Sequence, residues 1–279
     1  MGYRFTPVRK AKGGRLYRWE PASSPPPKIR LPLSVFSDEP SPATQQLSDS
    51  RPTPMSRPLE ELLNVPDPAW PLVQEWLAKA TNAVGVLEPP PYAAKELEAA
   101  QVTLRSPMGA IVYHTGGLLV DHGWLRILGG GGHPRMKRSL MGWNRTRTFD
   151  EAGNSRGFLL VADDILGGFF AINGGALGAD VKNIYYFAPD TLRWESLELG
   201  YTDFITFCFA GKIADFYGAY RWDNWQEDTE KIVGDEALSI APPLWTKEGK
   251  DPARSHRAAA PVSVIYDLNV VEFPRQLGP

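Results

Sequence analysis

The stretch GFLLVADDILGGFFAINGG, from Gly157 to Gly175, indicates two strands joined by a tight turn. Apolar, aromatic and β-branched residues fill both halves, which is typical of buried strands. Aspartate favours turns because its side chain bonds to nearby backbone amides, and glycine permits a positive φ. We therefore expect a central hairpin with an exposed turn at residues 163–168.

Asp163 and Asp164 in this stretch raise the alternative of a catalytic acid pair. Successive side chains of a strand point to opposite faces of the sheet, so two neighbouring acids on a strand cannot act on one substrate atom. No base, nucleophile or metal-ligand motif accompanies them in the sequence. The pattern favours a structural hairpin.

Further strands are expected on both sides of this hairpin. GAIVYHT (109–115), LLVDHGWLRIL (118–128) and NIYYFAPD (183–190) are rich in β-branched and aromatic residues. Gly116 and Gly117 supply a turn between the first two. Pro189 suits the second position of a type I turn at 188–191.

Helices are expected at 57–65, 67–82, 92–101 and 201–217. In the second, Asp67 is a suitable N-cap, Pro68 suits the first helical position, and apolar residues recur at helical spacing. Helices, then strands, then a helix predict an α+β fold: a single domain with a mostly antiparallel sheet, spanning residues 55–279.

Residues 1–54 differ in composition from the rest. This tail is rich in proline and serine, and its nine basic and four acidic residues give a net charge of +5. Such a segment buries too little apolar surface to offset its ordering entropy, so we expect disorder. Met55 opens a sequence that resembles a natural start, so an alternative is that the tail is not native coding sequence.

Composition also limits the class of protein. The chain of 279 residues has a net charge of −2, which leaves −7 for the part after residue 54 and argues against nucleic-acid binding. Neither a membrane-spanning run nor a secretory signal is visible, and the single Cys208 fits a reducing compartment. We expect a cytoplasmic protein without a membrane association.

No catalytic, cofactor or metal motif stands out. The four histidines lack the spacing of a metal site, and Asp121 and His122 would point to opposite faces of a strand. Cys208 lies in an apolar helical segment, where burial disfavours the thiolate. We assign no catalytic, cofactor-binding or metal-binding residue.

The glycine run ILGGGGHPRMKR admits two interpretations. The amides of Gly129–Gly132 with Arg135, Lys137 and Arg138 could cradle an anion. The run lacks the ending of a phosphate-binding loop, so a mobile surface loop within 129–156 is the favoured interpretation. The residues expected on a partner or ligand surface are Asp163, Asp164, His133, Arg135, Arg138 and Trp143.

Several segments carry a family resemblance, among them RPLEELLNVPDPAWPLVQEWL, GFLLVADDILGGFFAINGGALG and NIYYFAPDTLRWESLELGYTDF. They resemble the bacterial domain-of-unknown-function family 2625 over most of residues 56–250; residues 251–279 fit less well. More remotely, GGFFAING, NIYYFAPD and YTDFITF are similar to motifs of the SUKH superfamily. That second resemblance implies an immunity protein, since members of that superfamily often neutralise bacterial toxins.

The resulting expectation is a non-enzymatic protein-binding domain. An acidic and aromatic surface would occlude a toxin, and the charge of −7 favours a basic partner domain. The alternative is a small-ligand or anion-binding protein, or an enzyme, that uses the Gly129–Arg138 loop and the two aspartates.

Overall fold

A computed structural model describes residues 6–9, 15–18 and 56–277. The chain divides into two units, Met1–Pro52 and Thr53–Pro279. In the first unit, β1 (Thr6–Arg9) and β2 (Arg15–Arg18) pair as an antiparallel hairpin, which the composition did not predict. The predicted disorder elsewhere in residues 1–54 falls outside the described residues.

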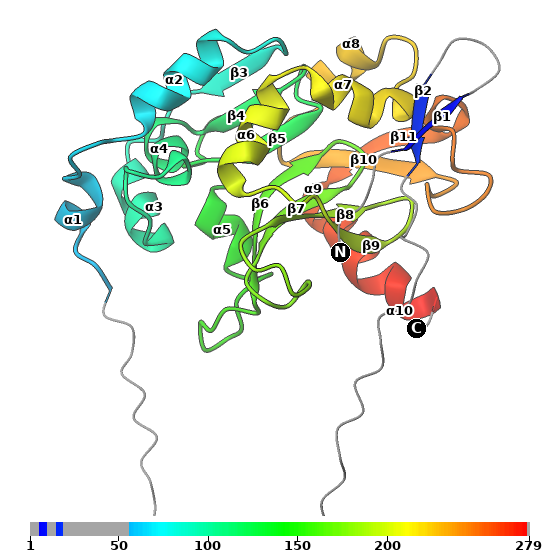
Figure 1. The fold of residues 1–279 in the computed structure, drawn as a ribbon. Coiled ribbons are helices and arrows are strands. Elements are labelled where there is room, and N and C mark those ends of the chain that lie inside the picture. Colours follow the sequence, from blue (N-terminus) through cyan, green and yellow to red (C-terminus); the bar gives the residue numbers. More distant parts are fainter. Residues whose placement is uncertain (1–5, 10–14, 19–55, 278–279) are drawn as a thin grey trace, which may run out of the picture. The chain divides into compact units, whose positions relative to one another are not determined.

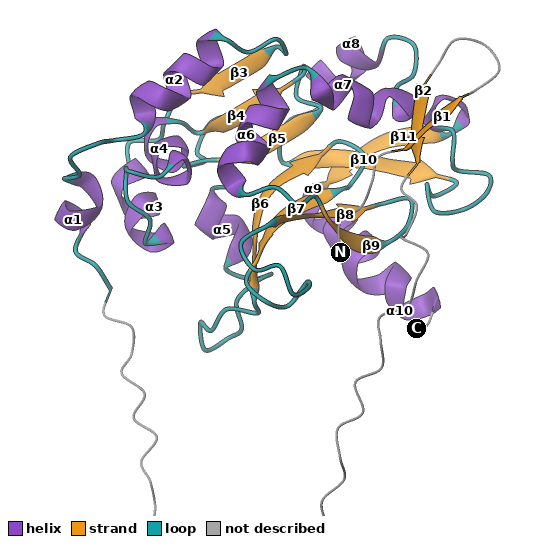
Figure 2. Cartoon of the chain, in the orientation of Figure 1, coloured by secondary structure: helices purple, strands orange, loops and turns teal. Residues whose placement is uncertain are grey.

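The second unit is built on a seven-stranded sheet in which each strand pairs with the next along the chain (Figures 1 and 2). All six pairings are antiparallel, as the sequence predicted. The strands are β3 (Val84–Leu87), β4 (Gly117–Val120), β5 (Leu125–Leu128), β6 (Phe158–Asp164), β7 (Phe169–Asn173), β8 (Ile184–Ala188) and β9 (Arg193–Ser196).

Helices and one further hairpin surround this sheet. The helices before β6 are α1 (Leu59–Leu63), α2 (Trp70–Ala78), α3 (Ala93–Ala100), α4 (Pro107–His114) and α5 (Leu140–Asn144). After β9 come α6 (Tyr201–Phe209), α7 (Lys212–Tyr217), η1 (Gly218–Tyr220), α8 (Trp225–Glu230), β10 (Glu236–Ala241), η2 (Pro252–Arg254), β11 (His256–Pro261), α9 (Val262–Tyr266), η3 (Asp267–Glu272) and α10 (Phe273–Leu277).

Adjacent phenylalanines in β7 show how the two faces of the sheet are covered. Phe170 packs against Phe204 of α6, with ring centroids 4.9 Å apart. Phe169 points to the other face and packs against Tyr266 of α9, also at 4.9 Å. Helices α6 and α9 therefore lie on opposite sides of the central strands (Figure 1).

The predicted strand at 109–115 is wrong, because this segment forms α4. Ser106 caps the helix by accepting a hydrogen bond from the amide of Gly109 at 3.0 Å, and Pro107 occupies the first turn. Cap and proline together specify a helix start, and this local signal outweighs the strand preference of Ile111 and Val112.

Two predicted helices have different bounds. Helix α2 begins at Trp70 rather than after Asp67, and Ala69 is its N-cap, with Pro71 in the first turn. The predicted helix 201–217 divides into α6 and α7 at Gly211, whose φ of +74° is left-handed and interrupts the helical path.

The interpretation of 129–156 as a surface loop is wrong for Gly129–Gly131 and for α5. Gly129, Gly130 and Gly131 are buried, and α5 buries Leu140 and Trp143 against the core. A residue larger than glycine would meet backbone atoms at 2.6–2.8 Å at these three glycines. Close backbone packing therefore explains the glycine run.

Candidate functional site

The two aspartates of the central hairpin are both fully buried, with no exposed side-chain area. They end β6, where their side chains alternate between the two faces of the sheet. Every residue from Leu160 to Ala171 is buried, including the turn. The expectation of an exposed turn at 163–168 is therefore wrong.

The C-terminal part of the chain covers this turn. The amide of Leu238 in β10 donates to the carbonyl of Ile165 at 2.8 Å. Asn269 of η3 donates from Nδ2 to the carbonyl of Gly167 at 3.1 Å. The sequence did not predict β10 or η3, so the cover over the turn was missed with them.

Asp163 pairs with two arginines. Arg126, directly opposite in β5, donates from Nε to Oδ1 at 2.7 Å. Arg138 forms an ion pair with Oδ2, and its side chain is only 8% exposed. Asp163 therefore balances buried positive charge and is inaccessible to a substrate.

Asp164 points to the opposite face and accepts four hydrogen bonds. The hydroxyls of Tyr186 and Tyr217 donate to Oδ2 at 2.7 and 2.8 Å, and the amides of Leu166 and Gly168 donate to Oδ1 at 2.9 and 2.8 Å. Burial raises the pKa of Asp164 above its ordinary value, while these bonds and Arg126 oppose the rise. The same burial raises the pKa values of both tyrosines.

The glycine run does not form an anion cradle with its amides. The amides of Gly130, Gly131 and Gly132 donate to carbonyls of Thr115, Gly116 and Lys137. Arg138 donates from Nε and Nη2 to the carbonyl of Gly234 at 3.0 and 2.6 Å. Asp235 accepts from the amides of Lys137 and Arg138, which fixes the segment to the chain before β10.

The six residues predicted for one surface do not gather on one. Asp163, Arg138 and Trp143 meet in the interior, with Arg138 over the Trp143 ring at 4.8 Å. Asp164 lies on the other face of the sheet. His133 and Arg135 are partly buried and share one local hydrogen bond, from the Arg135 amide to Nδ1 of His133.

A surface that the sequence did not predict lies on α8 and the β4–β5 turn, Asp121–Gly123. Asp223, Glu227 and Glu230 are exposed there beside Trp225, and residues 221–236 carry six acidic and two basic residues. His122 contacts Glu230 at 2.6 Å through Nδ1 and meets the Trp225 ring edge-on. We call this the α8 surface; its density of acidic residues around Trp222 and Trp225 was the available sequence signal.

The β4–β5 turn contacts α8 and the residues before it. Asp121, His122 and Gly123 all have positive φ values, of 53°, 62° and 88°, so the earlier assumption that Asp121 and His122 lie on a strand is wrong. Arg221 forms an ion pair with Asp121 and stacks over Trp225 at 4.0 Å. The turn therefore anchors α8 by charge pairs and ring contacts.

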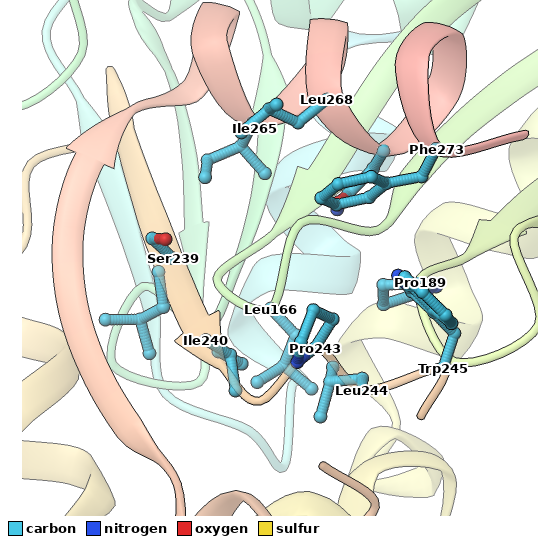
Figure 3. A pocket seen from close by; sticks show the side chains of 12 residues that line it. Leu166, Pro189, Ser239, Ile240, Pro243, Leu244, Trp245, Ile265, Leu268 and Phe273 are labelled. Atoms are coloured by element: carbon cyan, nitrogen blue, oxygen red, sulfur yellow. The ribbon is translucent and has the colours of Figure 1, made fainter. Parts of the chain in front are cut away.

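An apolar pocket lies on the C-terminal side of the central turn (Figure 3). Its walls come from the turn, β10, the segment after β10 and the C-terminal helices, with Leu166, Ile240, Trp245, Leu268 and Phe273 among them. The cavity volume is about 60 Å³. Cofactor and drug-sized sites measure about 300–1,000 Å³, so this pocket admits only a small apolar group or a few waters.

The described residues also bear on metals and membranes. No group of three His, Cys, Asp or Glu side chains among them is arranged to hold a metal ion. None of the helices in this part of the chain is long and apolar enough to cross a membrane. Cys208 is buried, which raises the pKa of its thiol and disfavours the thiolate.

The fold is an α+β domain built on an antiparallel meander. Its buried acids, Asp163 and Asp164, bind to other residues of the domain. The chain belongs to a family described as "Protein of unknown function DUF2625", whose model matches residues 59–265. The resemblance seen in the sequence is confirmed for this family, and it extends beyond residue 250 into α9.

Two relatives show the reach of this similarity. The uncharacterised protein YbfG of Escherichia coli (strain K12) is 46% identical over 192 residues, 68% of this chain and 87% of the relative. An uncharacterised protein of Haemophilus influenzae (strain ATCC 51907 / DSM 11121 / KW20 / Rd) is 40% identical over 187 residues, 67% and 82% of the two chains. No solved structure matches the chain.

Proposed function

We propose that this protein is a non-enzymatic binding domain that uses the α8 surface to hold a basic protein partner. The observation that carries the proposal is the contrast between the two sets of acids. Asp163 and Asp164 are enclosed and hydrogen-bonded within the core, whereas Asp223, Glu227 and Glu230 are exposed beside Trp225. Exposed acidic groups beside a partly buried aromatic ring suit recognition rather than proton transfer.

The chemistry of the interface follows from this composition. An acidic surface attracts a basic partner during encounter, and ring faces contribute contact area at low entropic cost. The ion pair between Arg221 and Asp121 and the contact between His122 and Glu230 hold α8 in place before binding. A pre-formed surface loses less entropy when it binds.

A toxin-immunity role is the specific form of this proposal. In that role the α8 surface would cover the active site of a basic toxin domain in the cytoplasm and block it by occlusion. It rests on the resemblance to SUKH motifs at GGFFAING and NIYYFAPD and on the acidic charge of the domain. The predicted outcome is rescue of growth when the protein is co-expressed with a toxin encoded beside its gene.

Site-specific photocrosslinking in the native host tests the binding surface. A photoreactive amino acid at Gln226, exposed on α8, should capture one defined protein; the same group at Glu98, exposed on α3, serves as the control. Equal capture at both positions, or capture only at Glu98, would contradict the assignment of the α8 surface. A captured acidic protein would contradict the charge argument.

A further inference from the structure

The apolar pocket beside the central turn has a buried floor and a partly exposed rim (Figure 3). The floor includes the buried side chains of Leu166, Leu244 and Ile265. Ile240 and Leu268 lie at the rim, where they are only partly buried. A small molecule can therefore enter from solvent and cover apolar surface that water contacts unfavourably.

The lining of the pocket selects against charge. Among the described residues that line it, none has a charged side chain. Ser239 is exposed, and Nδ2 of Asn269 already donates to the carbonyl of Gly167 at 3.1 Å. A charged ligand would lose its hydration here without gaining a counter-charge, which is strongly unfavourable. The lining therefore favours a neutral ligand.

Trp245 brings an unused hydrogen-bond donor to the wall of the pocket. Its Nε1 is buried and has no acceptor in the described part of the chain. The indole packs against the ring of Phe273 on α10, with centroids 5.7 Å apart, which holds it in place. Buried donors are nearly always hydrogen-bonded, so an indole N–H that lacks an acceptor beside a cavity indicates a place for water or a ligand.

A π-helix forms one side of the pocket. This segment, η3, joins α9 to α10 and contributes Leu268 and Asn269 to the wall. Such turns are rare in proteins and occur frequently at functional sites. A cavity, an unused donor and a π-helix thus coincide at one place in the fold.

We propose that this pocket binds a small neutral aliphatic molecule whose carbonyl or hydroxyl oxygen accepts a hydrogen bond from Nε1 of Trp245. A cavity of about 150 Å³ accepts benzene, so the volume of about 60 Å³ here holds about three or four heavy atoms. The apolar floor contacts the alkyl part of the ligand, and the indole N–H binds its oxygen. The site uses no residue of the α8 surface and does not depend on the proposed protein partner.

Nitrogen–proton correlation NMR of the full chain tests the site, because the indole N–H of Trp245 gives a resonance of its own. Trp245→Phe identifies that resonance by removing it. Titration with propionamide should shift the resonance saturably with a millimolar Kd, since so few ligand atoms limit the affinity. Propionate has nearly the same shape but carries a charge, and it should bind at least about tenfold more weakly.

Three variants separate the pocket from the rest of the surface. Ile240→Phe fills the pocket from its rim and should abolish the shift, whereas Val264→Phe, exposed on α9 outside the lining, should bind like the wild type. Trp245→Phe keeps a ring against Phe273 without the N–H, and the methyl resonances of Leu268 should report binding about fivefold weaker. Absence of a saturable shift in the wild type, equal binding of propionate, or unchanged binding in Ile240→Phe or Trp245→Phe would overturn the proposal.

Discussion

Asp163 forms two buried ion pairs within the domain. It lies between Arg126 and Arg138, and all three side chains are nine-tenths or more buried. Removing one partner of a buried ion pair leaves an uncompensated charge in a medium of low dielectric. The acid that the sequence offered as a catalytic candidate therefore has a stabilising role.

Asp163→Asn should lower the free energy of unfolding by about 3–5 kcal/mol, because Arg126 loses its ion-pair partner and Arg138 keeps only Asp235, 3.7 Å from its Nε. Urea denaturation measures the change. Asp203→Asn, at an exposed position in α6, should change it by no more than about 0.5 kcal/mol. Similar losses in the two variants would show that the buried pairs do not stabilise the fold.

Gly168 leaves the space that Asp164 and Tyr186 occupy. A Cβ there would stand 2.4 Å from Oδ2 of Asp164 and 2.4 Å from the Tyr186 hydroxyl. Gly168→Ala should therefore cost about 1–3 kcal/mol through overpacking. Gly218→Ala is the matched control, since a Cβ there meets no atom within 4 Å and alanine favours helical backbone. A lower Tm for Gly218→Ala than for Gly168→Ala in thermal denaturation would contradict this account.

The ionisation of Asp164 should make stability depend on pH. Burial raises its folded-state pKa above the unfolded value, so its contribution is fully present below the unfolded pKa and is lost as pH rises through the folded pKa. Asp164→Asn lacks this contribution. The stability advantage of the wild type over Asp164→Asn should therefore be larger at pH 4 than at pH 7. Urea denaturation of both proteins between pH 4 and pH 7 measures how this stability difference changes with pH. A larger advantage of the wild type at pH 7 would show that folding lowers the pKa of Asp164.

At the scale of elements, strands that alternate in a simple meander could be predicted from sequence. The hairpin of β6 and β7 and strand β8 match their predicted segments, because each has a continuous apolar run ended by turn residues. Strand β9 was missed because it is short. It has four residues, lies at the edge of the sheet and buries none of its side chains fully, so its hydrophobic pattern is weak. Helix α4 was mistaken for a strand because its apolar run resembles one and only the cap distinguishes it.

The candidate site was less predictable than the fold. Arg126 lies in the run LRIL, where a lone arginine among apolar strand residues was a readable signal of a buried ion pair. Its partner Asp163 is 37 residues away along the chain, and no sequence spacing encodes that contact or the second ion pair of Asp163 with Arg138. The cover over the turn comes from Leu238 and Asn269, which lie farther still.

Ser106→Ala tests the cap that decides the state of α4. The hydroxyl accepts from the Gly109 amide and donates to the Thr103 carbonyl, so its loss should cost about 1 kcal/mol. Ser263→Ala within α9 should be neutral or slightly stabilising, because alanine has the higher helix propensity. Equal stability of Ser106→Ala and the wild type in chemical denaturation would remove the cap as the explanation.

At the scale of the whole molecule, the charged residues of the interior and those of the surface are arranged differently. The interior holds paired aspartates and arginines, and the α8 surface holds exposed acids beside an aromatic ring. Relatives in two bacteria share 46% and 40% identity with this chain over most of the domain. The account's central claim is that binding resides in the α8 surface and that the buried acids only support the fold.

Calorimetric titration of the partner captured at Gln226 tests this claim most directly. The wild type is compared with the double variant Asp223→Asn and Glu227→Gln, and with the control Glu60→Gln and Glu98→Gln on α1 and α3. The α8 variant should bind at least about tenfold more weakly, a loss of about 1.4 kcal/mol, with a smaller dependence on salt. Unchanged affinity in the α8 variant, or an equal loss in the control, would contradict the account.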